Sequence, residues 1–364
     1  MAVVCAPKWP WISLGIPWLL WMTGSGIGFL CRADSFGVMG GDMLTDQRKR
    51  RHRDDATDRT GVMLALPAPQ TMIQKRLIDT AGLLTDAPDG IAYQHSILCQ
   101  TSLPYRDPGP EVRRWSRRQG DAMLEIDAGR AVHPELGEFV DVPLPWGPKA
   151  RLILMHLNAE AIRTQSARVN VGDSLTDFVQ RIGIDPKGRN IRLIREQVTA
   201  LSTALIRLGF VEGQRAQQTH AQIVEGFELW LPKDARQRVL WPSYVDLNLR
   251  YFESLRTHAV PLDERAVGAL SHSAMALDLY AWLAQRLHRV PKPHRQLIPW
   301  PAVRDQFGSD YARIRKFREK FMTALRQVHA VYPAMKVDVT DKGLLLHTSP
   351  PPVAKTGVVV RLPA

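Results

Sequence analysis

Cysteine is scarce in this sequence of 364 residues, and its three copies, Cys5, Cys31 and Cys99, lie far apart. Such spacing provides neither a disulfide framework nor a zinc site. Structural disulfides persist in oxidising compartments, so a chain without them is consistent with a reducing one. We therefore expect a cytoplasmic protein.

Motifs for catalysis are also missing. No G-x-x-x-x-G-K-[ST] loop occurs, which argues against an ATP-driven motor. The eleven histidines are scattered, so no His-hydrophobic-His pair is available for the metal of a rolling-circle nickase. No cluster of acids suggests two-metal chemistry. We expect no enzymatic activity, no metal and no cofactor.

One long apolar run occurs, at residues 9–30 (WPWISLGIPWLLWMTGSGIGFL). It is long enough to cross a bilayer, but two prolines, four tryptophans and a Gly/Ser run make it a poor signal sequence. Three interpretations remain: a membrane anchor, a segment that is cleaved or buried, and a start codon assigned too far upstream. We favour the last, because codons for residues 40–42 (GGD) can form a purine-rich ribosome-binding tract directly before Met43.

Positive charge is in excess, with 48 Lys and Arg against 36 Asp and Glu and a net charge of +12. This favours an anionic partner such as nucleic acid or a membrane surface. The excess is concentrated at residues 311–331, where apolar residues recur at helical spacing: Ile314, Phe317, Phe321, Leu325 and Val328. The remaining positions carry Glu319 and six basic residues: Arg313, Arg315, Lys316, Arg318, Lys320 and Arg326. This pattern is typical of a solvated basic face or of a helix that binds a polyanion; we favour the second interpretation.

The same pattern occurs twice in the chain. Three pairs of segments match in the same order: 151–157 with 276–283, 175–183 with 299–308, and 194–201 (IREQVTAL) with 317–325 (FREKFMTAL). Their Arg-Glu pairs, at Arg195 and Arg318, are 123 residues apart. Three matches at a nearly constant offset indicate an internal duplication.

Each copy has the pattern of a long apolar helix, a short helix ending in Gly, a basic helix and a pair of strands. This order predicts a helix-turn-helix closed by a β-hairpin, the winged-helix arrangement, in which the short helix supports a basic helix that enters the major groove. We expect the hairpin strands at residues 210–212 and 223–230 in the first copy and at 336–340 and 344–347 in the second. Residues 213–222 would be the long polar tip of the first hairpin.

The predicted fold is α+β, mainly α, with two tandem winged-helix domains. We divide the chain into an apolar segment upstream of the true start (1–42), a largely disordered tail with one helix (43–100), a first winged-helix domain with preceding short strands (101–231), a connecting strand and helix (232–273), a second winged-helix domain (274–348) and a Pro-rich tail (349–364). Helices are expected at residues 71–84, 149–164, 175–182, 190–208, 261–270 and 311–331, and further strands at 122–126, 139–142 and 239–241.

The residues predicted to contact DNA lie on the basic helices and the wing tips. Arginine near the start of a recognition helix can bond guanine O6 and N7 together, so base contacts are expected from Arg192, Arg195, Thr199, Arg313, Arg315 and Lys316. Phosphate contacts are expected from Arg318 and Lys320, whereas Arg326 lies too far along its helix to reach. Arg215 and Lys342 at the wing tips are candidates for phosphate or minor-groove contact, although a single wing residue is more often only solvated.

Two acids and four tryptophans leave alternatives open. Glu196 and Glu319 would either accept a hydrogen bond from cytosine N4 or form a helical salt bridge with a basic neighbour. Packing in the core is the expected role of the tryptophans beside apolar runs or prolines: Trp146, Trp241, Trp282 and Trp300.

Several stretches of the chain resemble the plasmid RepA-type replication initiators of proteobacteria. They are TSLPYR (101–106), PLPWGPKARLIL (143–154), EAIRTQSARVNVGDSLTDFVQRIGI (160–184), HAVPLDERAVGAL (258–270) and SAMALDLYAWLAQRL (273–287). The resemblance covers about residues 101–346 and has no counterpart for residues 1–42. It implies an initiator that binds direct repeats in double-stranded plasmid origin DNA and helps to melt an adjacent A·T-rich segment. It also implies recruitment of the host replicative helicase and host initiator proteins, and often repression of its own gene; a homodimer is one option.

Two other functions remain as alternatives. A winged-helix transcriptional repressor would bind DNA in the same way without an initiator role, and composition does not separate the two. A membrane-anchored DNA-binding protein would require residues 1–42 to be translated. The resemblance favours the initiator.

Overall fold

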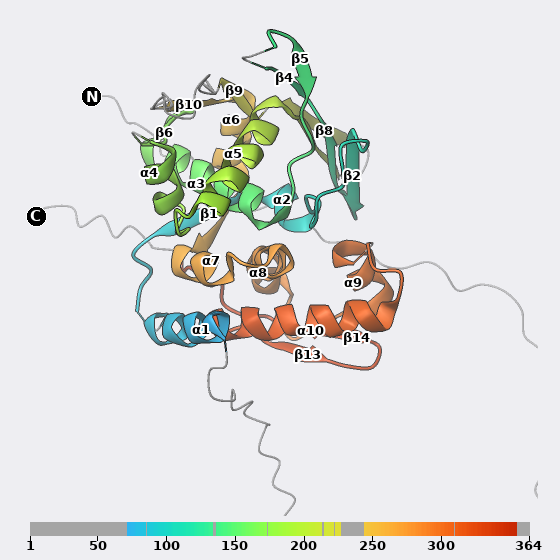
Figure 1. The fold of residues 1–364 in the computed structure, drawn as a ribbon. Helices are drawn as coiled ribbons and strands as arrows, with labels where there is room; N and C mark the ends of the chain where they lie inside the picture. Colours follow the sequence, from blue (N-terminus) through green and yellow to red (C-terminus); the bar gives the residue numbers. More distant parts are fainter. Residues whose placement is uncertain are drawn as a thin grey trace, which may run out of the picture. The chain divides into compact units, whose positions relative to one another are not determined.

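The computed structural model describes residues 71–84, 86–133, 136–172, 174–212, 215–221, 223–226, 244–308 and 310–354. All of them belong to one compact unit, Ala65–Ala364. The expectations for residues 1–42, for the strand at 239–241 and for Trp241 lie outside the described residues. The described part is a mixed fold of helices and sheets (Figure 1).

The elements follow the repeat expected from the sequence, with additional ones before and between the copies. Before the first copy the chain forms α1 (Met72–Leu83), β1 (Ile91–His95), α2 (Ser96–Gln100), β2 (Arg114–Gln119), β3 (Ala122–Asp127), β4 (Arg130–Val132) and β5 (Phe139–Asp141). The first copy holds α3 (Gly147–Thr164), β6 (Arg168–Asn170), α4 (Leu175–Arg181), α5 (Gly188–Thr203), β7 (Leu205–Glu212), β8 (Arg215–Ala221), β9 (Val224–Gly226) and β10 (Tyr244–Leu247).

The linking segment and the second copy complete the described chain. The link consists of α6 (Leu249–His258), β11 (Ala259–Asp263) and α7 (Glu264–Leu270). The second copy holds α8 (Ala274–Arg286), the 3-10 helix η1 (Leu287–Arg289), β12 (Gln296–Pro299), α9 (Trp300–Phe307), α10 (Ile314–Val331), β13 (Val337–Val339) and β14 (Gly343–Leu346).

Both copies therefore run through a long apolar helix, a strand, a short helix and a long basic helix before their last strands. Each also has a three-stranded antiparallel sheet in which the strand after the first helix lies at one edge. The order is β6-β10-β9 in the first copy and β12-β14-β13 in the second. Equal helix order and equal sheet order support the internal duplication inferred from the sequence.

The glycines that follow the two short helices occupy equivalent places for different physical reasons. Gly183 has a φ of +71°, a left-handed conformation that side chains rarely adopt. Gly308 has an ordinary φ, but a Cβ there would lie 2.1 Å from Cδ2 of the buried Phe317. The sequence pattern predicted both positions correctly without distinguishing a backbone requirement from a packing requirement.

The hairpin expected in the first copy is wrong in its strands. The basic helix α5 ends at Thr203, so Leu205 and Leu208 belong to β7, which pairs with β8 inside the expected polar tip. β7 also pairs with β3, and the sheet order is β2-β3-β7-β8. The pairing places Leu208 opposite Leu124, both of them buried. The apolar residue Leu208 is therefore buried by the pairing of its strand with β3, not by one side of a longer helix.

The tail expected to be largely disordered at residues 43–100 is ordered over its last part. Its one expected helix is confirmed as α1, which starts with a capping box between Thr71 and Gln74. Over residues 91–100 the expectation of disorder is wrong, because β1 pairs with β11 and α2 buries Leu98 and Cys99, whereas residues 43–70 lie outside the described residues. The same pairing converts the start of the helix expected at 261–270 into β11, so α7 begins only at Glu264.

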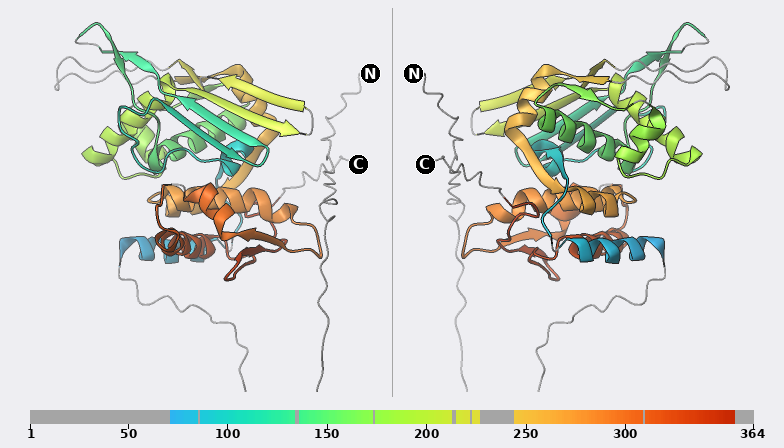
Figure 2. Two further views of the ribbon diagram at one scale, coloured as in Figure 1. Left: turned by 90° about the vertical axis from the view of Figure 1, so that its right-hand side faces the viewer. Right: turned by 90° about the vertical axis from the view of Figure 1, so that its left-hand side faces the viewer.

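The helix α8 forms the centre of the packing. All its residues from Ala274 to Gln285 are buried, including Trp282 as expected, and it contacts α2, α3, α7, α10 and β11. Figures 1 and 2 show it between α3 of the first copy and α10 of the second. A helix that is apolar on all sides can exist in water only when it is covered in this way.

A buried ion pair joins the first helices of the two copies. Arg151 on α3 donates from Nε to Oδ1 of Asp278 on α8 (2.6 Å) and from Nη2 to Oδ2 (2.7 Å). Its other N–H groups donate to the backbone oxygens of Leu103, Pro104 and Gly147. Three of the stretches that resemble RepA-type initiators meet at this pair. The sequence pattern did not reveal it, because the two residues are 127 positions apart.

A buried histidine makes the stability of the fold sensitive to acid. His95 accepts a hydrogen bond at Nδ1 from the Ile97 amide and lies 3.0 Å from Ser254 Oγ through Nε2. Burial, and to a smaller extent the nearby His258, lower the pKa of His95 to about 3. The unfolded chain therefore binds a proton below pH about 6.5 that the folded chain does not bind until about pH 3. The stability of the folded chain that depends on neutral His95 is therefore fully present above pH 6.5 and is lost as the pH falls.

We therefore expect the wild-type free energy of unfolding to fall by about 2 kcal/mol between pH 6.5 and 5 because of His95 alone, at about 1.4 kcal/mol per pH unit. His95→Asn, whose side chain can still accept from the Ile97 amide, should show a shallower dependence. Urea unfolding at a series of pH values measures both slopes. Equal slopes for the two proteins would contradict the assignment.

Candidate nucleic-acid interface

The basic helix of the second copy presents most of its predicted contacts to solvent. Buried residues of α10 include Phe317, Phe321, Leu325 and Val328, as the sequence predicted, but Ile314 is 40% exposed. The exposed side chains are Arg313, Arg315, Lys316, Lys320 and Arg326. The first turn of α10 therefore carries three exposed basic residues and no acid.

Arg318 differs from its neighbours on α10 because it is half-buried. Its guanidinium carbon lies 4.4 Å from the ring centroid of Trp300, which is buried as expected and contacts Phe321 edge to face. The backbone N–H of Trp300 donates to the Lys342 oxygen (3.1 Å), and its indole N–H donates to the Thr340 oxygen. Trp300 therefore connects the basic helix with the exposed turn between β13 and β14 that carries Lys342.

The basic helix of the first copy is arranged in a similar way. Arg192 is exposed, whereas Arg195 and Thr199 are half-buried, and the Thr199 hydroxyl donates to the Arg195 backbone oxygen (2.9 Å). Ile194, Val198 and Leu201 are buried on the opposite side. Arg215 begins β8, in the strand that the sequence had described as a polar tip. Arg189, exposed in the first turn of α5, was not among the predicted contacts.

Both acids of the basic helices form helical salt bridges. Glu319 accepts from Nζ of Lys316 (2.9 Å), and the pKa of Glu319 is lowered by this hydrogen bond and by the nearby positive charges. Glu196 lies 3.6 Å from Nε of Arg192. Of the two alternatives left open, the helical ion pair is therefore the one present in the free protein.

The starts of α5 and α10 distinguish them from the other helices. Among the described α-helices, only these two begin on a lysine or arginine with no side-chain hydrogen bond to the first turn: Lys187 and Arg313. Six helices are capped by a side chain, and the remaining two have proline in their first turn. Free backbone N–H groups and the positive end of the helix dipole favour an anion at such a start.

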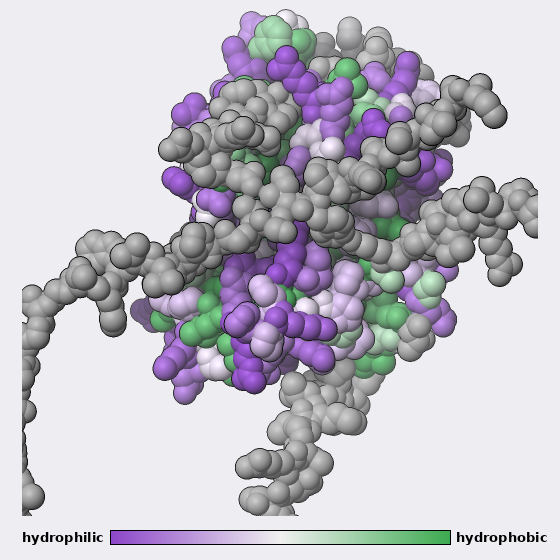
Figure 3. Space-filling model, turned by 180° about the vertical axis from the view of Figure 1, so that it is seen from behind, coloured by the Kyte–Doolittle hydropathy of each residue, from purple (hydrophilic) through white to green (hydrophobic). Residues whose placement is uncertain are grey.

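The hydropathy of the surface alone does not identify the interface. The face opposite to that of Figure 1 is also largely hydrophilic where described residues are visible, with scattered hydrophobic residues between them (Figure 3). What separates α5 and α10 is the combination of an exposed basic first turn and an uncapped, basic start.

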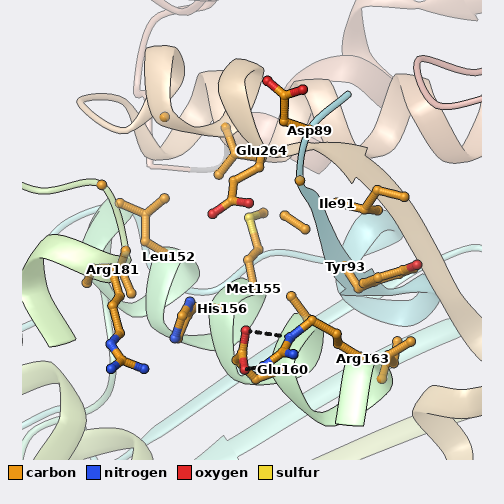
Figure 4. A pocket seen from close by; sticks show the side chains of 18 residues that line it. Asp89, Ile91, Tyr93, Leu152, Met155, His156, Glu160, Arg163, Arg181 and Glu264 are labelled. Atoms are coloured by element: carbon orange, nitrogen blue, oxygen red, sulfur yellow. Dashed lines mark hydrogen bonds and ion pairs between the residues drawn. The ribbon is translucent and has the colours of Figure 1, made fainter. Parts of the chain in front are cut away.

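A cavity at the surface of the described chain does not form part of this basic surface. It measures about 750 Å³ and is lined by β1, α3, α7 and the end of α4 (Figure 4). Its charged residues are of both signs: Glu160 pairs with Arg163 at 2.5 Å, and Glu264 and Asp89 add carboxylates. Burial raises the pKa of Glu264, and the charges of Glu160 and Asp263 raise it further. The cavity includes none of the residues predicted to contact DNA.

Metal clusters and membrane-spanning helices are both absent from the described residues. No group of three or more His, Cys, Asp or Glu side chains there is arranged to hold a metal ion. No helix in the same part of the chain is both long and apolar enough to cross a membrane.

Comparison with known proteins gives a family match and likenesses to solved structures. Two of the solved structures are domains 2 and 3 of RctB as SeMet derivatives (TM-score 0.42, 11% identity, 62% of this chain and 80% of that chain) and RctB domains 2–3 (TM-score 0.43, 12% identity, 69% and 94%). No curated protein sequence matches the chain.

The family match covers residues 144–301, from just before α3 to the start of α9. It therefore contains α5 and the buried Arg151–Asp278 pair but ends before α10. The family is RepA_C, described as plasmid encoded RepA protein. These residues are therefore similar to plasmid-encoded RepA proteins, and the match supports the resemblance that the sequence showed.

Proposed function

We propose that this protein initiates plasmid replication by binding repeated origin DNA through α5 and α10. The family match supports the initiator role. In each copy, the helix order and the three-stranded sheet support assignment as a winged-helix domain, in which the third helix is the one that enters the major groove. On this assignment α5 and α10 are the recognition helices, and Arg192, Arg315 and their neighbours contact DNA.

The observation that carries the proposal is the pair of uncapped basic helix starts. A positive side chain at a helix N-terminus costs about 0.3–1 kcal/mol, because it faces the positive end of the dipole. The first turn of α10 accumulates Arg313, Arg315 and Lys316 and contains no acid, although Lys316 is paired with Glu319 one turn later. Such an arrangement is unfavourable in the free protein and becomes favourable when phosphate groups approach.

The later steps of initiation rest on the resemblance alone. We propose that the protein helps to open the origin and recruits the host replicative helicase and initiator proteins, with no catalytic step of its own. A homodimer on the origin belongs to the same proposal. Because plasmid DNA lies in the cytoplasm, the proposed function also places the protein there.

A replication assay tests the proposal. The gene with its flanking native DNA is placed on a vector that cannot replicate in the host, and transformants are counted. We expect colonies from the wild type and none from the variant Arg313→Ala, Arg315→Ala, Lys316→Ala. A matched control removes three other exposed basic residues, Arg163, Arg250 and Arg256, and should replicate.

The other outcomes have definite meanings. If the wild type binds the flanking DNA but gives no colonies, the repressor without an initiator role is favoured. If the α10 variant replicates as well as the control, α10 does not carry the function. A gene that starts at Met43 tests the expectation for residues 1–42.

A further inference from the structure

We propose that Arg106, from the segment that precedes the first copy, is a phosphate contact beside the start of α10. This inference rests on the proposed function and extends its DNA-binding surface to a residue outside both basic helices. Arg106 is exposed, and its guanidinium carbon lies 5.7 Å from the ring centroid of Tyr311. Tyr311 precedes Arg313, the first residue of the uncapped start of α10, by two positions.

The contact with Tyr311 places Arg106 on a well-supported surface. The Tyr311 ring packs against the buried Phe317, with centroids 5.9 Å apart. The backbone N–H of Tyr311 donates to the Gly308 oxygen. The backbone oxygen of Tyr311 accepts from Nη2 of Arg304 (3.1 Å). An arginine that lies over an aromatic ring keeps its N–H edges free for hydrogen bonds, which phosphate oxygens can accept in pairs.

The backbone that carries Arg106 is also held in place. Residues 101–104 are buried, and the Thr101 hydroxyl donates to the Ile97 oxygen (2.8 Å). The buried Arg151 binds the oxygens of Leu103 and Pro104. The backbone at this position is therefore preorganised for a phosphate contact, so little backbone conformational entropy is lost on binding.

The charges around Arg106 favour an anion. Arg117 on β2 lies 3.6 Å from Asp310, the acid next to Tyr311 in the chain, whereas no carboxylate of the described chain forms an ion pair with Arg106. Arg106 thus lies next to a helix start that already carries the exposed cations Arg313 and Arg315. Like charges that meet at the positive end of a helix repel each other, and a DNA phosphate between them removes that repulsion.

Fluorescence anisotropy with the full chain tests the contact. Two labelled duplexes are used, one with a repeat from the flanking DNA and one of unrelated sequence, each over a series of salt concentrations. We expect Arg106→Ala to weaken binding to both duplexes by the same factor, about 5- to 10-fold, and to reduce the salt slope by about 0.9. Arg106→Lys should retain most of the binding.

The control is Arg250→Ala, an exposed arginine on α6 with the same charge change, which should leave binding unchanged. Thermal melting of each variant establishes that it is folded, and Arg106→Gln replaces the alanine variant if that one is unstable. Equal binding by the Arg106 and Arg250 variants overturns the inference, as does a loss confined to the repeat, which would indicate a base contact. If the wild type binds neither duplex, the proposed function itself fails.

Discussion

Asp278→Asn is expected to lower the free energy of unfolding by about 3–5 kcal/mol, the typical cost of removing one partner of a buried ion pair. The side chains of Arg151 and Asp278 are 1% and 7% exposed, and their two hydrogen bonds measure 2.6 and 2.7 Å. An amide in place of the carboxylate leaves a guanidinium charge in the core without a counter-ion. Urea unfolding of the wild type and the variant, monitored by circular dichroism, measures the loss.

Two further variants separate the ion pair from the mere change of a charge. Asp246→Asn removes the acid of an exposed pair, 3.8 Å from Arg168, and should change stability by less than about 1 kcal/mol. The double variant Arg151→Met, Asp278→Leu removes both charges and should recover only part of the loss, because the backbone oxygens of Leu103, Pro104 and Gly147 lose their donor. A loss no larger than that of Asp246→Asn would contradict the structural role given to the pair.

On the proposed function, changing both α5 and α10 should be far more damaging to DNA binding than changing one of them. Arg192 and Arg315 occupy equivalent places in the two copies, each exposed in an early turn of its helix. If each contacts a guanine, its replacement by alanine costs about 1–3 kcal/mol, or about 5- to 150-fold in affinity. Because the residues lie on different helices, the two losses should add, which predicts about 30- to 20,000-fold for the double variant.

Footprinting shows which part of the binding site each helix contacts. We expect each single variant to lose protection over one part of the binding site and the double variant to lose it throughout. Anisotropy supplies the affinities, and the variant Arg163→Ala, Arg256→Ala serves as a control with the same charge change. A wild-type footprint confined to one half-turn of DNA would refute the idea that one protomer contacts two successive major-groove faces.

Much of the fold was readable from local patterns. The stripe of Phe317, Phe321, Leu325 and Val328 predicted α10, because residues at these spacings lie on one side of a helix and are buried together. The shared Arg-Glu pairs and glycines predicted the repeat of helices. These features depend on neighbours a few positions apart, so the amino-acid order contains them directly.

Features that depend on distant partners were missed or misassigned. Leu205 and Leu208 fit the helical pattern of the basic helix, but pairing with β3 makes them part of a strand. Residues 91–95 were predicted to be part of a tail. They form a strand only because they pair with β11, which lies far along the chain. An isolated strand leaves its backbone hydrogen bonds unmade, so a short segment of this kind has no strong local signal.

Some features of the candidate interface were likewise predictable from the sequence, and others only from the tertiary structure. The amino-acid sequence by itself determined that two basic amphipathic helices exist, which side of each is packed against the core, and that the chain resembles RepA-type initiators. Only the tertiary structure decided that Arg106 lies against Tyr311 and that Arg151 finds Asp278, because each contact joins positions more than a hundred residues apart. Local spacing sets which face of a helix is polar, whereas long-range packing sets which segments meet.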